Sequence, residues 1–494
     1  MILLRSAARN ISIVAASHLL MWLATMAFTV AQARYLEPAL FGQLSLALSY
    51  GVFLSIVIDF GLGAQLSRMV AQRSGGHGEA VVGTIVIRGA LWLAALPVLW
   101  LVTILLDYEP ALQKAILVLA VSVLFAGIGG TVGAYLQGRE EFLLPSLAGI
   151  AQRFTAATIG VLILMSRPEL GAVAGAFVIA AVVNVVVLLA GLRARLRIPQ
   201  RIDPGTAVTL LRSGTVLGAY WVLANFYFNF DMVMLQKLAA AENVGWYAAA
   251  YRLFNAATIV PVIVAGIVLY PILARLSLGP RAELAAVIEK ALTLLTLTGV
   301  AAALLLAVNA DGIVAFLYPY EEYAPAAGAL RLLAPGLLFL YVNSVLTYAF
   351  FALHRERRLL LMAGAFALLN PLANLLAIPL LRQEGAAVVT SLTELGLLVW
   401  LLISMPRDLL NAESLRVAAK ASLAAVTAAL VVGLIGPQAL YVSMPLALVV
   451  YVAICLCLRT VAPGDLDAIV AVFGRPRRPA ALRPIAQPIH EEVT

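Results

Sequence analysis

The sequence predicts an all-α polytopic membrane protein with about 14 transmembrane helices. Three observations support this: a composition too apolar for water, apolar runs that can cross a bilayer, and basic residues collected in the loops of one side. Of the 494 residues, 63% are apolar and only 12% charged, and the mean hydropathy is +1.00. A soluble domain carries roughly 25% charged residues. Lipid must therefore be the solvent for most of the surface of this chain.

The apolar runs predict helices and not a barrel. Each holds about 20 residues or more, enough to cross roughly 30 Å of hydrocarbon at 1.5 Å per residue. None shows the two-residue alternation of barrel strands. The predicted spans lie at 11–33, 43–63, 82–106, 113–137, 143–165, 170–192, 213–236, 244–274, 286–308, 326–353, 359–381, 385–405, 415–436 and 440–461.

The basic residues test this helix count. If the N-terminus is cytoplasmic, 24 of the 33 Lys and Arg residues fall on the cytoplasmic side and five on the outer side. A missed or invented helix would reverse every later loop and abolish this asymmetry. We therefore predict 14 spans in a bacterial inner membrane, with both termini cytoplasmic. The net charge of +8 is spread through these loops, so it indicates topology and no nucleic-acid partner.

The two halves of the chain resemble each other weakly. Phe41-Gly42 before one predicted helix corresponds to Val244-Gly245 before another, and Gly171-Ala172 corresponds to Gly385-Ala386. Chance similarity among apolar helices is the alternative explanation. A parallel repeat of six helices would give two facing lobes, as in many transporters. The predicted regions are an N-lobe at 1–200, a C-lobe at 201–410, a helix pair at 411–461 and a disordered cytoplasmic tail at 462–494.

Several motifs resemble the multidrug/oligosaccharidyl-lipid/polysaccharide (MOP) exporter superfamily, and more narrowly its Wzx-type polysaccharide flippases. The motifs are spread over most of the chain, and their order is more specific than any one of them. They are Leu36 to Gly42, Asp59 to Leu62, Tyr135 to Phe142, Asn229 to Leu235, Val244 to Tyr247, Ala250 to Leu253, Tyr318 to Tyr323, and Asn370 to Pro379 followed by Glu384 to Ala387.

This resemblance implies two six-helix lobes in a V shape similar to that of multidrug exporters, with a central cavity and alternating access. It implies transport of a polyprenyl-pyrophosphate-linked oligosaccharide, a precursor of exopolysaccharide, capsule or O-antigen. Implied partners are this glycolipid, membrane lipids and polysaccharide polymerases or glycosyltransferases, and we expect a monomer. The extra pair at 415–436 and 440–461 is similar to the peptidoglycan-precursor branch of the superfamily, which leaves the glycan open.

Four arginines inside predicted helices are candidate substrate contacts. A charged side chain costs about 2.5–3.5 kcal/mol at a helix centre on insertion scales, so it faces a cavity or a partner. Arg153 and Arg252 lie well inside their helices and are the first candidates for the pyrophosphate, which the planar guanidinium binds in bidentate fashion. Arg88 and Arg331 lie nearer helix ends and could reach the interface. The alternative role for all four is structural pairing.

Three acidic residues are candidates for binding a coupling ion. Glu394 lies at mid-depth in its helix and could hold a cation or pair with an arginine. Asp231 and Asp59 lie closer to helix ends and could equally be solvated. No cofactor is expected, and a proton or sodium gradient is one possible drive. We expect no catalytic residue and no resident metal.

Amide and aromatic side chains are the candidate sugar contacts. Asn225 and Asn229 share a helix face, as do Asn370 and Asn374, and interhelical hydrogen bonds are the alternative role. Aromatic residues between 220 and 230 could stack on sugars or pack the protein.

Two other functions remain open. An ion-coupled multidrug exporter of the same superfamily would favour an acidic cavity, which four intramembrane arginines oppose. A membrane polymerase or glycosyltransferase would need a long outer loop, and no predicted outer loop is long. The chain also has no GxxxxGK[ST] loop for ATP.

Overall fold

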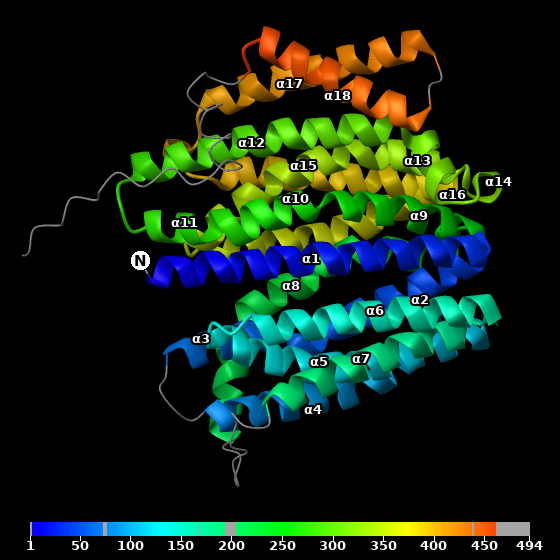
Figure 1. Ribbon diagram of the computed structural model, residues 1–494, viewed down its shortest axis with the longest axis vertical. Helices are drawn as coiled ribbons and strands as arrows, with labels where there is room; N and C mark the ends of the chain where they lie inside the picture. The colour runs from blue at the N-terminus through cyan, green and yellow to red at the C-terminus, as the bar shows by residue number, and fades with distance from the viewer. Residues whose placement is uncertain (1, 73–76, 167, 193–203, 437–438, 461–494) are drawn as a thin grey trace, which may run out of the picture.

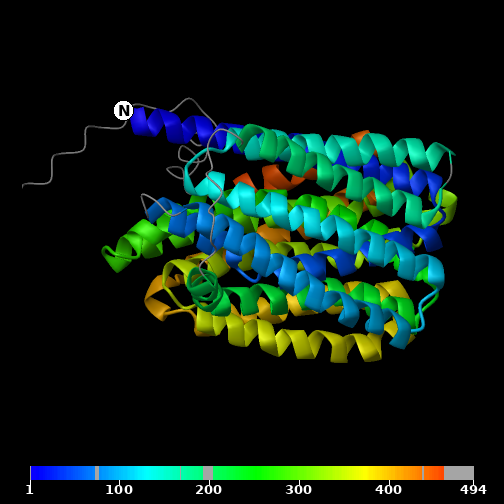
Figure 2. The same ribbon diagram turned by 90° about the horizontal axis from the view of Figure 1, so that it is seen from below.

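The computed structural model describes residues 2–72, 77–166, 168–192, 204–436 and 439–460, and the described residues form helices and no strand. Most of the long helices lie side by side with their axes nearly parallel (Figures 1 and 2). The predicted basic connector and the predicted disordered tail lie mainly outside the described residues.

The N-lobe consists of seven helices. Their bounds are α1 (Ile2–Tyr35), α2 (Pro38–Asp59), α3 (Leu62–Gln72), α4 (His77–Leu105), α5 (Pro110–Gly138), α6 (Leu143–Ser166) and α7 (Leu170–Leu192). Pro38 and Pro110 each occupy a first helical turn, where the missing N–H costs nothing. α2 ends where Phe60 adopts a left-handed conformation, and the short α3 follows.

The C-lobe runs from α8 to α16, and two more helices follow it. The bounds are α8 (Pro204–Leu238), α9 (Ala241–Ala257), α10 (Ile259–Pro261), η1 (Val262–Leu269), α11 (Tyr270–Leu276), α12 (Arg281–Val308), α13 (Ala310–Leu317), α14 (Tyr320–Tyr323), α15 (Ala326–Ala352), α16 (Glu356–Ser404), η2 (Arg407–Leu409), α17 (Ala412–Ile435) and α18 (Leu440–Cys457).

The predicted count of 14 spans differs from the described helices at two places. By length and apolar composition, 12 described helices can cross a membrane. One of them, α16, is interrupted at Arg382, where the chain reverses, so it supplies the two spans predicted at 359–381 and 385–405. The other is α8, predicted at 213–236, whose Asn225, Asn229 and Asp231 lower its hydropathy below that of its neighbours.

The helices of each lobe pack on one another, and one apolar core continues across both lobes. In the N-lobe, α7 packs on α5 and α6, and α1 packs on α6. In the C-lobe, α16 packs on α8 and α15, and α15 also packs on α12. The pair α17 and α18 covers the outer side of α12 through its own apolar cluster around Ala424, Ala428 and Tyr451 (Figure 1). The pair therefore lies beside the C-lobe and away from the N-lobe.

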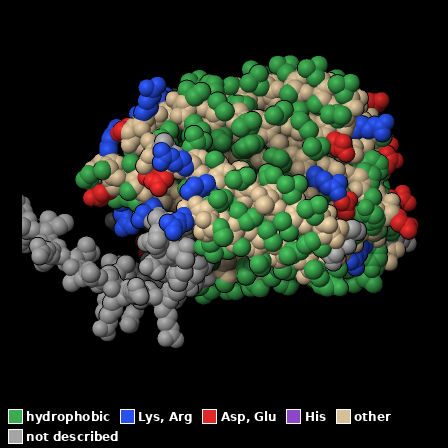
Figure 3. All heavy atoms as spheres, turned by 90° about the horizontal axis from the view of Figure 1, so that it is seen from above, with side chains coloured by type: hydrophobic (Ala, Val, Ile, Leu, Met, Phe, Trp, Pro, Cys, Tyr) green, Lys and Arg blue, Asp and Glu red, His purple; other side chains and the backbone are tan. Residues whose placement is uncertain are grey.

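The two ends of the molecule differ in charge. We call the end with Arg68, Arg139 and Arg275 the basic end, and the end with Glu109 and Glu242 the acidic end. Figure 3 shows charged side chains collected at both ends and mostly hydrophobic ones between them. This apolar belt is what a protein that spans a bilayer requires.

The lobes meet most closely between α2 and α9, near the acidic end. A Cβ built on Gly245 would lie 1.9 Å from the carbonyl oxygen of Pro38, and one on Gly42 would lie 2.6 Å from the backbone nitrogen of Gly245. Only glycine permits this backbone contact. Gly42 and Gly245 are also the two glycines that correspond to each other in the predicted repeat. A second close approach joins the lobes nearer the basic end, where a Cβ on Gly218 of α8 would lie 2.6 Å from the carbonyl oxygen of Phe60.

Candidate functional site

A cavity of about 440 Å3 lies in the C-lobe among α8, α9, α15 and α16, and its largely apolar wall carries several amide side chains. We call it the amide cavity, because Asn225, Asn229, Asn255 and Asn343 line it. Its wall also carries aromatic rings, from Tyr220, Trp221, Tyr227, Phe228, Tyr251, Tyr348 and Phe351. Amides and hydroxyls can exchange hydrogen bonds with sugar hydroxyls, and rings offer apolar faces to sugar rings.

Asn225 and Asn229 enter this cavity from one face of α8. The Nδ2 of Asn225 donates to the carbonyl oxygen of Trp221 at 3.0 Å, and the Nδ2 of Asn229 donates to that of Asn225 at 3.2 Å. Each amide is thereby held by its own helix. Neither makes another hydrogen bond to the described residues, so the rest of each amide is left for a ligand.

Glu394 lies at the bottom of the amide cavity with 2% of its surface exposed. Asn343 donates to its Oε2 at 2.8 Å and to its backbone carbonyl oxygen at 2.9 Å. No Lys or Arg among the described residues pairs with it, so the predicted pairing with an arginine is not found. A buried carboxylate with a single amide partner favours a bound proton or cation.

Asp231 is the centre of a second polar cluster, between α8, α9 and α16. The hydroxyls of Tyr247 and Thr390 each donate to its Oδ2 at 2.9 Å, and Asn374 donates to its Oδ1 at 2.8 Å. Only 1% of its surface is exposed, so the alternative of a solvated helix-end residue is wrong here. Neutral donors alone surround this carboxylate.

The Asp231 cluster has the composition of a monovalent cation or proton site. It combines a carboxylate, hydroxyl oxygens and amide oxygens, which are ligands that hard cations accept. Among the described residues, Asn374 Oδ1 is buried without a hydrogen-bond partner. The Nδ2 of the same amide faces Asp231, and a bound cation or water would supply the partner that this oxygen lacks. No group of three or more His, Cys, Asp or Glu gathers anywhere in the described part of the chain.

Arg252 joins the two lobes in the acidic half of the molecule. It comes from α9, and its Nη1 donates to Thr29 of α1 at 3.0 Å while its Nη2 donates to Ser45 of α2 at 3.1 Å. Its guanidinium also lies over the ring of Phe41, 5.1 Å from the centroid. Both hydrogen-bond partners are neutral, so the charge of Arg252 has no counter-ion among the described residues.

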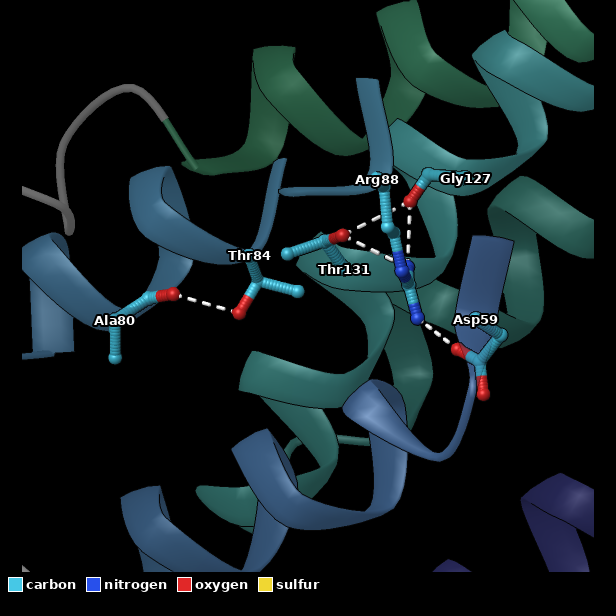
Figure 4. A network of polar contacts seen from close by, with 6 residues as sticks. All are labelled: Asp59, Ala80, Thr84, Arg88, Gly127 and Thr131. Atoms are coloured by element: carbon cyan, nitrogen blue, oxygen red, sulfur yellow. Dashed lines mark hydrogen bonds and ion pairs between the residues drawn. The ribbon is translucent and has the colours of Figure 1, made fainter. Parts of the chain in front are cut away.

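Arg88 is the centre of a network inside the N-lobe (Figure 4). It forms an ion pair with Asp59 of α2 and donates to the Gly127 carbonyl oxygen at 2.6 Å and the Thr131 hydroxyl at 2.7 Å, both in α5. Both members of the ion pair line a cavity of about 1170 Å3 that lies within the N-lobe. Arg88 and Asp59 are therefore paired with each other inside the N-lobe, and neither belongs to the Asp231 cluster.

Arg153 and Arg331 occupy different settings. Arg153 of α6 is exposed and makes no hydrogen bond or ion pair with any described residue. On the helical wheel it lies on the side of Ser146 and Gly160, which contact α1, and away from Leu147, Phe154 and Leu162, which face lipid. Arg331 forms a half-exposed ion pair with Asp311 at the acidic end. It therefore lies far from the amide cavity.

The structure brings some predicted residues together and leaves others apart. Asn225, Asn229 and Glu394 share the amide cavity, whereas Arg153 and Arg252 do not line it. The sequence interpretation did not identify Tyr247 and Thr390 as partners of Asp231, or Asn255 and Asn343 as cavity residues. Each of these four residues is a polar residue within an apolar helix, which is the one sign that the sequence offers. The same sign accompanies many ordinary interhelical hydrogen bonds, so it does not identify a site.

The described fold is that of an all-helical membrane protein with polar sites inside its bundle of helices. Residues 7–277 match the model of the polysaccharide biosynthesis protein family, and because this match covers more than half of the chain, the chain belongs to that family. No curated protein sequence matches it significantly.

Solved transporter structures share the fold. The lipid II flippase MurJ in an inward closed conformation aligns with a TM-score of 0.75 at 15% identity, covering 90% of this chain and 98% of MurJ. An inward-facing multidrug resistance MATE family transporter of the MOP superfamily gives 0.66 at 15% identity, with coverages of 78% and 94%. A mutant of the Vibrio cholerae MATE transporter VcmN gives 0.57 at 15% identity, with coverages of 81% and 97%. These comparisons confirm the predicted fold class.

Proposed function

We propose that this protein moves a polyprenyl-pyrophosphate-linked oligosaccharide from the cytoplasmic to the outer leaflet of a bacterial inner membrane by alternating access. The amide cavity is the observation that supports this choice of substrate. Its four asparagines and surrounding aromatic rings suit a sugar. The glycan cannot cross hydrocarbon unaided, since each buried polar group without a partner costs several kcal/mol. A cavity inside the protein that offers amide partners removes that barrier.

The orientation follows from the charges. The basic end is the cytoplasmic end, because short loops rich in Lys and Arg stay inside. The acidic end, where α2 and α9 touch backbone to backbone, then faces outward. A transporter closed on its outer side is ready to accept substrate from the cytoplasm.

Arg252 couples the substrate to the movement of the lobes. Its bonds to Thr29 and Ser45 hold the lobes together in the outer half. A pyrophosphate would offer charged oxygens in place of these two neutral hydroxyls, and charge-assisted bonds are stronger. Binding would therefore release Thr29 and Ser45 and favour opening toward the outside. The unpartnered Arg153 supplies a second cation from the N-lobe at mid-depth.

Two sources can drive the cycle. With the inside negative, outward movement of an anion is favourable by about 2.3 kcal/mol per charge per 100 mV. The Asp231 cluster could in addition exchange a proton or sodium ion between the two states. Partners in this pathway would be the glycosyltransferases that build the glycolipid and the polymerase that uses it outside, and the protein would act as a monomer.

The test is a flipping assay in liposomes that contain the purified protein. We expect a fluorescent polyprenyl-pyrophosphate oligosaccharide to reach the opposite leaflet much faster than in protein-free liposomes. The same liposomes should not concentrate a cationic dye when a proton or sodium gradient is applied. Dye transport without glycolipid flipping would refute the proposal in favour of a multidrug exporter.

A further inference from the structure

A second cavity lies at the basic end, between the lobes. It has a volume of about 930 Å3 and is lined by Arg68 of α3, by α8, by Tyr270 of α11 and by residues 348–358 around the turn from α15 to α16. We call its charged edge the arginine rim, which consists of Arg68, Arg355, Arg357 and Arg358. One lobe contributes Arg68 and the other contributes the remaining three.

The arginine rim carries an excess of positive charge. Its four arginines are accompanied by a single acid, Glu356, whose Oε1 lies 3.9 Å from the Nδ1 of His354. Arg358 donates to the carbonyl oxygen of Ser404 at 2.7 Å and keeps its charge unpaired. Arg68 and Arg357 make no side-chain hydrogen bond or ion pair within the described part of the chain, and Arg355 makes no hydrogen bond but lies within electrostatic range of Asp408. Unpaired guanidinium groups around one cavity are suited to bind an anion with several oxygens.

The rim cavity adjoins the amide cavity. Trp221, Tyr348 and Phe351 line both cavities, so they form a shared aromatic wall between the arginines and the asparagines. A ligand that occupies both would be anionic at the basic end, would stack on rings in the middle and would offer hydroxyls at the inner end. This is the order of groups along a sugar chain attached to a phosphate.

The rim lies at the basic end of the helices, next to the apolar belt. Arg355, Arg357 and Arg358 follow the end of α15 at the basic end, and Arg68 lies on α3 at that same end. α3 lies with Leu62, Leu66 and Val70 buried and Arg68 exposed. Phosphates of inner-leaflet lipids occupy this interface while their tails remain in hydrocarbon.

We propose that the arginine rim is the loading site for the pyrophosphate of the lipid-linked substrate, held between Arg68 of one lobe and Arg355 and Arg357 of the other. This rests on the proposed function, because it specifies where that substrate is first bound. The rim holds the pyrophosphate at the interface while the sugars pass the aromatic wall into the amide cavity. Contacts from both lobes allow the bound anion to draw the lobes together at the basic end.

Basic loop residues are expected on the cytoplasmic side for topology alone. Topology does not require them to surround one cavity from two lobes or to lie without partners. The chain offers a matched comparison, because Arg407 and Arg416 are exposed at the same end and line none of the described cavities. They serve topology without facing the substrate path.

The test compares two double variants in nanodiscs of zwitterionic lipid, with empty nanodiscs as background. Arg355→Gln/Arg357→Gln removes two charges from the rim, and Arg407→Gln/Arg416→Gln removes two from elsewhere on the same end. Farnesyl diphosphate is the probe, and phosphatidylglycerol, titrated separately, represents an ordinary lipid phosphate. We expect the rim variant to bind farnesyl diphosphate at least tenfold more weakly and the control variant to bind it as the wild type does. Arg68→Gln should weaken binding in the same direction from the other lobe.

The possible results separate the two proposals. Equal binding by wild type and both double variants would overturn the rim as the pyrophosphate site and leave the proposed substrate intact. No binding of farnesyl diphosphate by the wild type would count against the proposed substrate itself. Arginine-dependent binding of phosphatidylglycerol without farnesyl diphosphate binding would also overturn the proposal, because the rim would then hold ordinary phospholipid. Membrane abundance of each variant shows whether folding is preserved.

Discussion

Asp231 is a single carboxylate enclosed by hydroxyl and amide donors, with no cation among the described residues to neutralise it. If the cluster carries the coupling ion, Asp231→Asn should remove the dependence of flipping on a proton or sodium gradient, because the amide cannot exchange a proton or neutralise a cation. Flipping driven by the membrane potential alone should persist. The measurement is the liposome assay with each gradient applied in turn.

Glu394 provides the comparison for Asp231. Glu394→Gln keeps the size of a side chain that faces the amide cavity and removes its charge. If Asp231 alone carries the coupling ion, we expect the gradient dependence to remain and only glycan binding to weaken. Gradient dependence that is lost in Glu394→Gln and kept in Asp231→Asn would transfer the coupling role to Glu394. Gradient dependence that is kept in both variants would remove ion coupling from the mechanism.

Arg252 is expected to affect both binding and closure. A charge-assisted contact to phosphate contributes about 1.5–3 kcal/mol, so Arg252→Ala should bind the glycolipid roughly tenfold more weakly or worse. Arg252→Lys keeps the charge without the bidentate fork and should give an intermediate loss. Membrane abundance and glycolipid binding are measured together. Normal abundance with undiminished binding would show that Arg252 does not contact the substrate.

Single residues could be predicted from the sequence better than their partners. The cost of charge in hydrocarbon singled out Arg252 and Glu394, whereas Asp231 and Arg88 were given an interfacial alternative that their burial does not support. Their partners were not predictable, because Asp59 is 29 residues from Arg88 and Thr390 is 159 residues from Asp231. Only the arrangement of the helices decides which distant polar groups meet.

At the scale of elements, the contact between α2 and α9 can be tested by a single substitution. Gly245→Ala would put a methyl group inside the van der Waals radius of the Pro38 carbonyl oxygen, so the lobes should separate at the acidic end. We expect a cysteine at Ala33, which is 1% exposed, to react faster with an impermeant thiol reagent from the outside. The native cysteines, Cys455 and Cys457, would be replaced first.

Gly175→Ala in α7 is the matched control for this experiment. A Cβ on Gly175 meets no atom within 4 Å, so this variant should label at the wild-type rate. Equal labelling of the Gly245→Ala and Gly175→Ala proteins would mean that the lobes tolerate a side chain at position 245. The contact would then not be an outer closure.

Helices were predicted from the sequence more accurately than their irregularities. The span predicted at 244–274 is instead a series in which α9 ends at Ala257 and a π-helix occupies Val262–Leu269 before α11. Pro261 lacks a backbone N–H and Pro271 follows shortly after, so regular hydrogen bonding cannot continue through this stretch. Apolar periodicity carries no information about such local changes, whereas the reversal at Arg382 had its signal in the polar residues between two apolar runs.

For the whole molecule, the orientation can be tested directly. Reporter fusions within the 193–212 connector and after Arg475 should both report a cytoplasmic location, since they follow an even number of predicted spans. The asymmetry of basic residues motivates this expectation. An outer location for either fusion would show that the helix count or the assignment of the basic end is wrong.

The low hydropathy of α8 has a consequence for how the protein is made. An Asp in an isolated helix opposes insertion, by roughly 2.5–3.5 kcal/mol at the helix centre and by less toward its ends, and α8 carries Asp231 with Asn225 and Asn229. The partners of Asp231, which are Tyr247, Asn374 and Thr390, are synthesised later. We therefore expect α8 alone to insert poorly in a translation assay and to insert better when α9 follows it or when Asp231 is replaced by Leu. The polar residues of α8 that suit ions and sugars would thus delay its stable insertion. The helix would depend on segments that the ribosome has not yet produced.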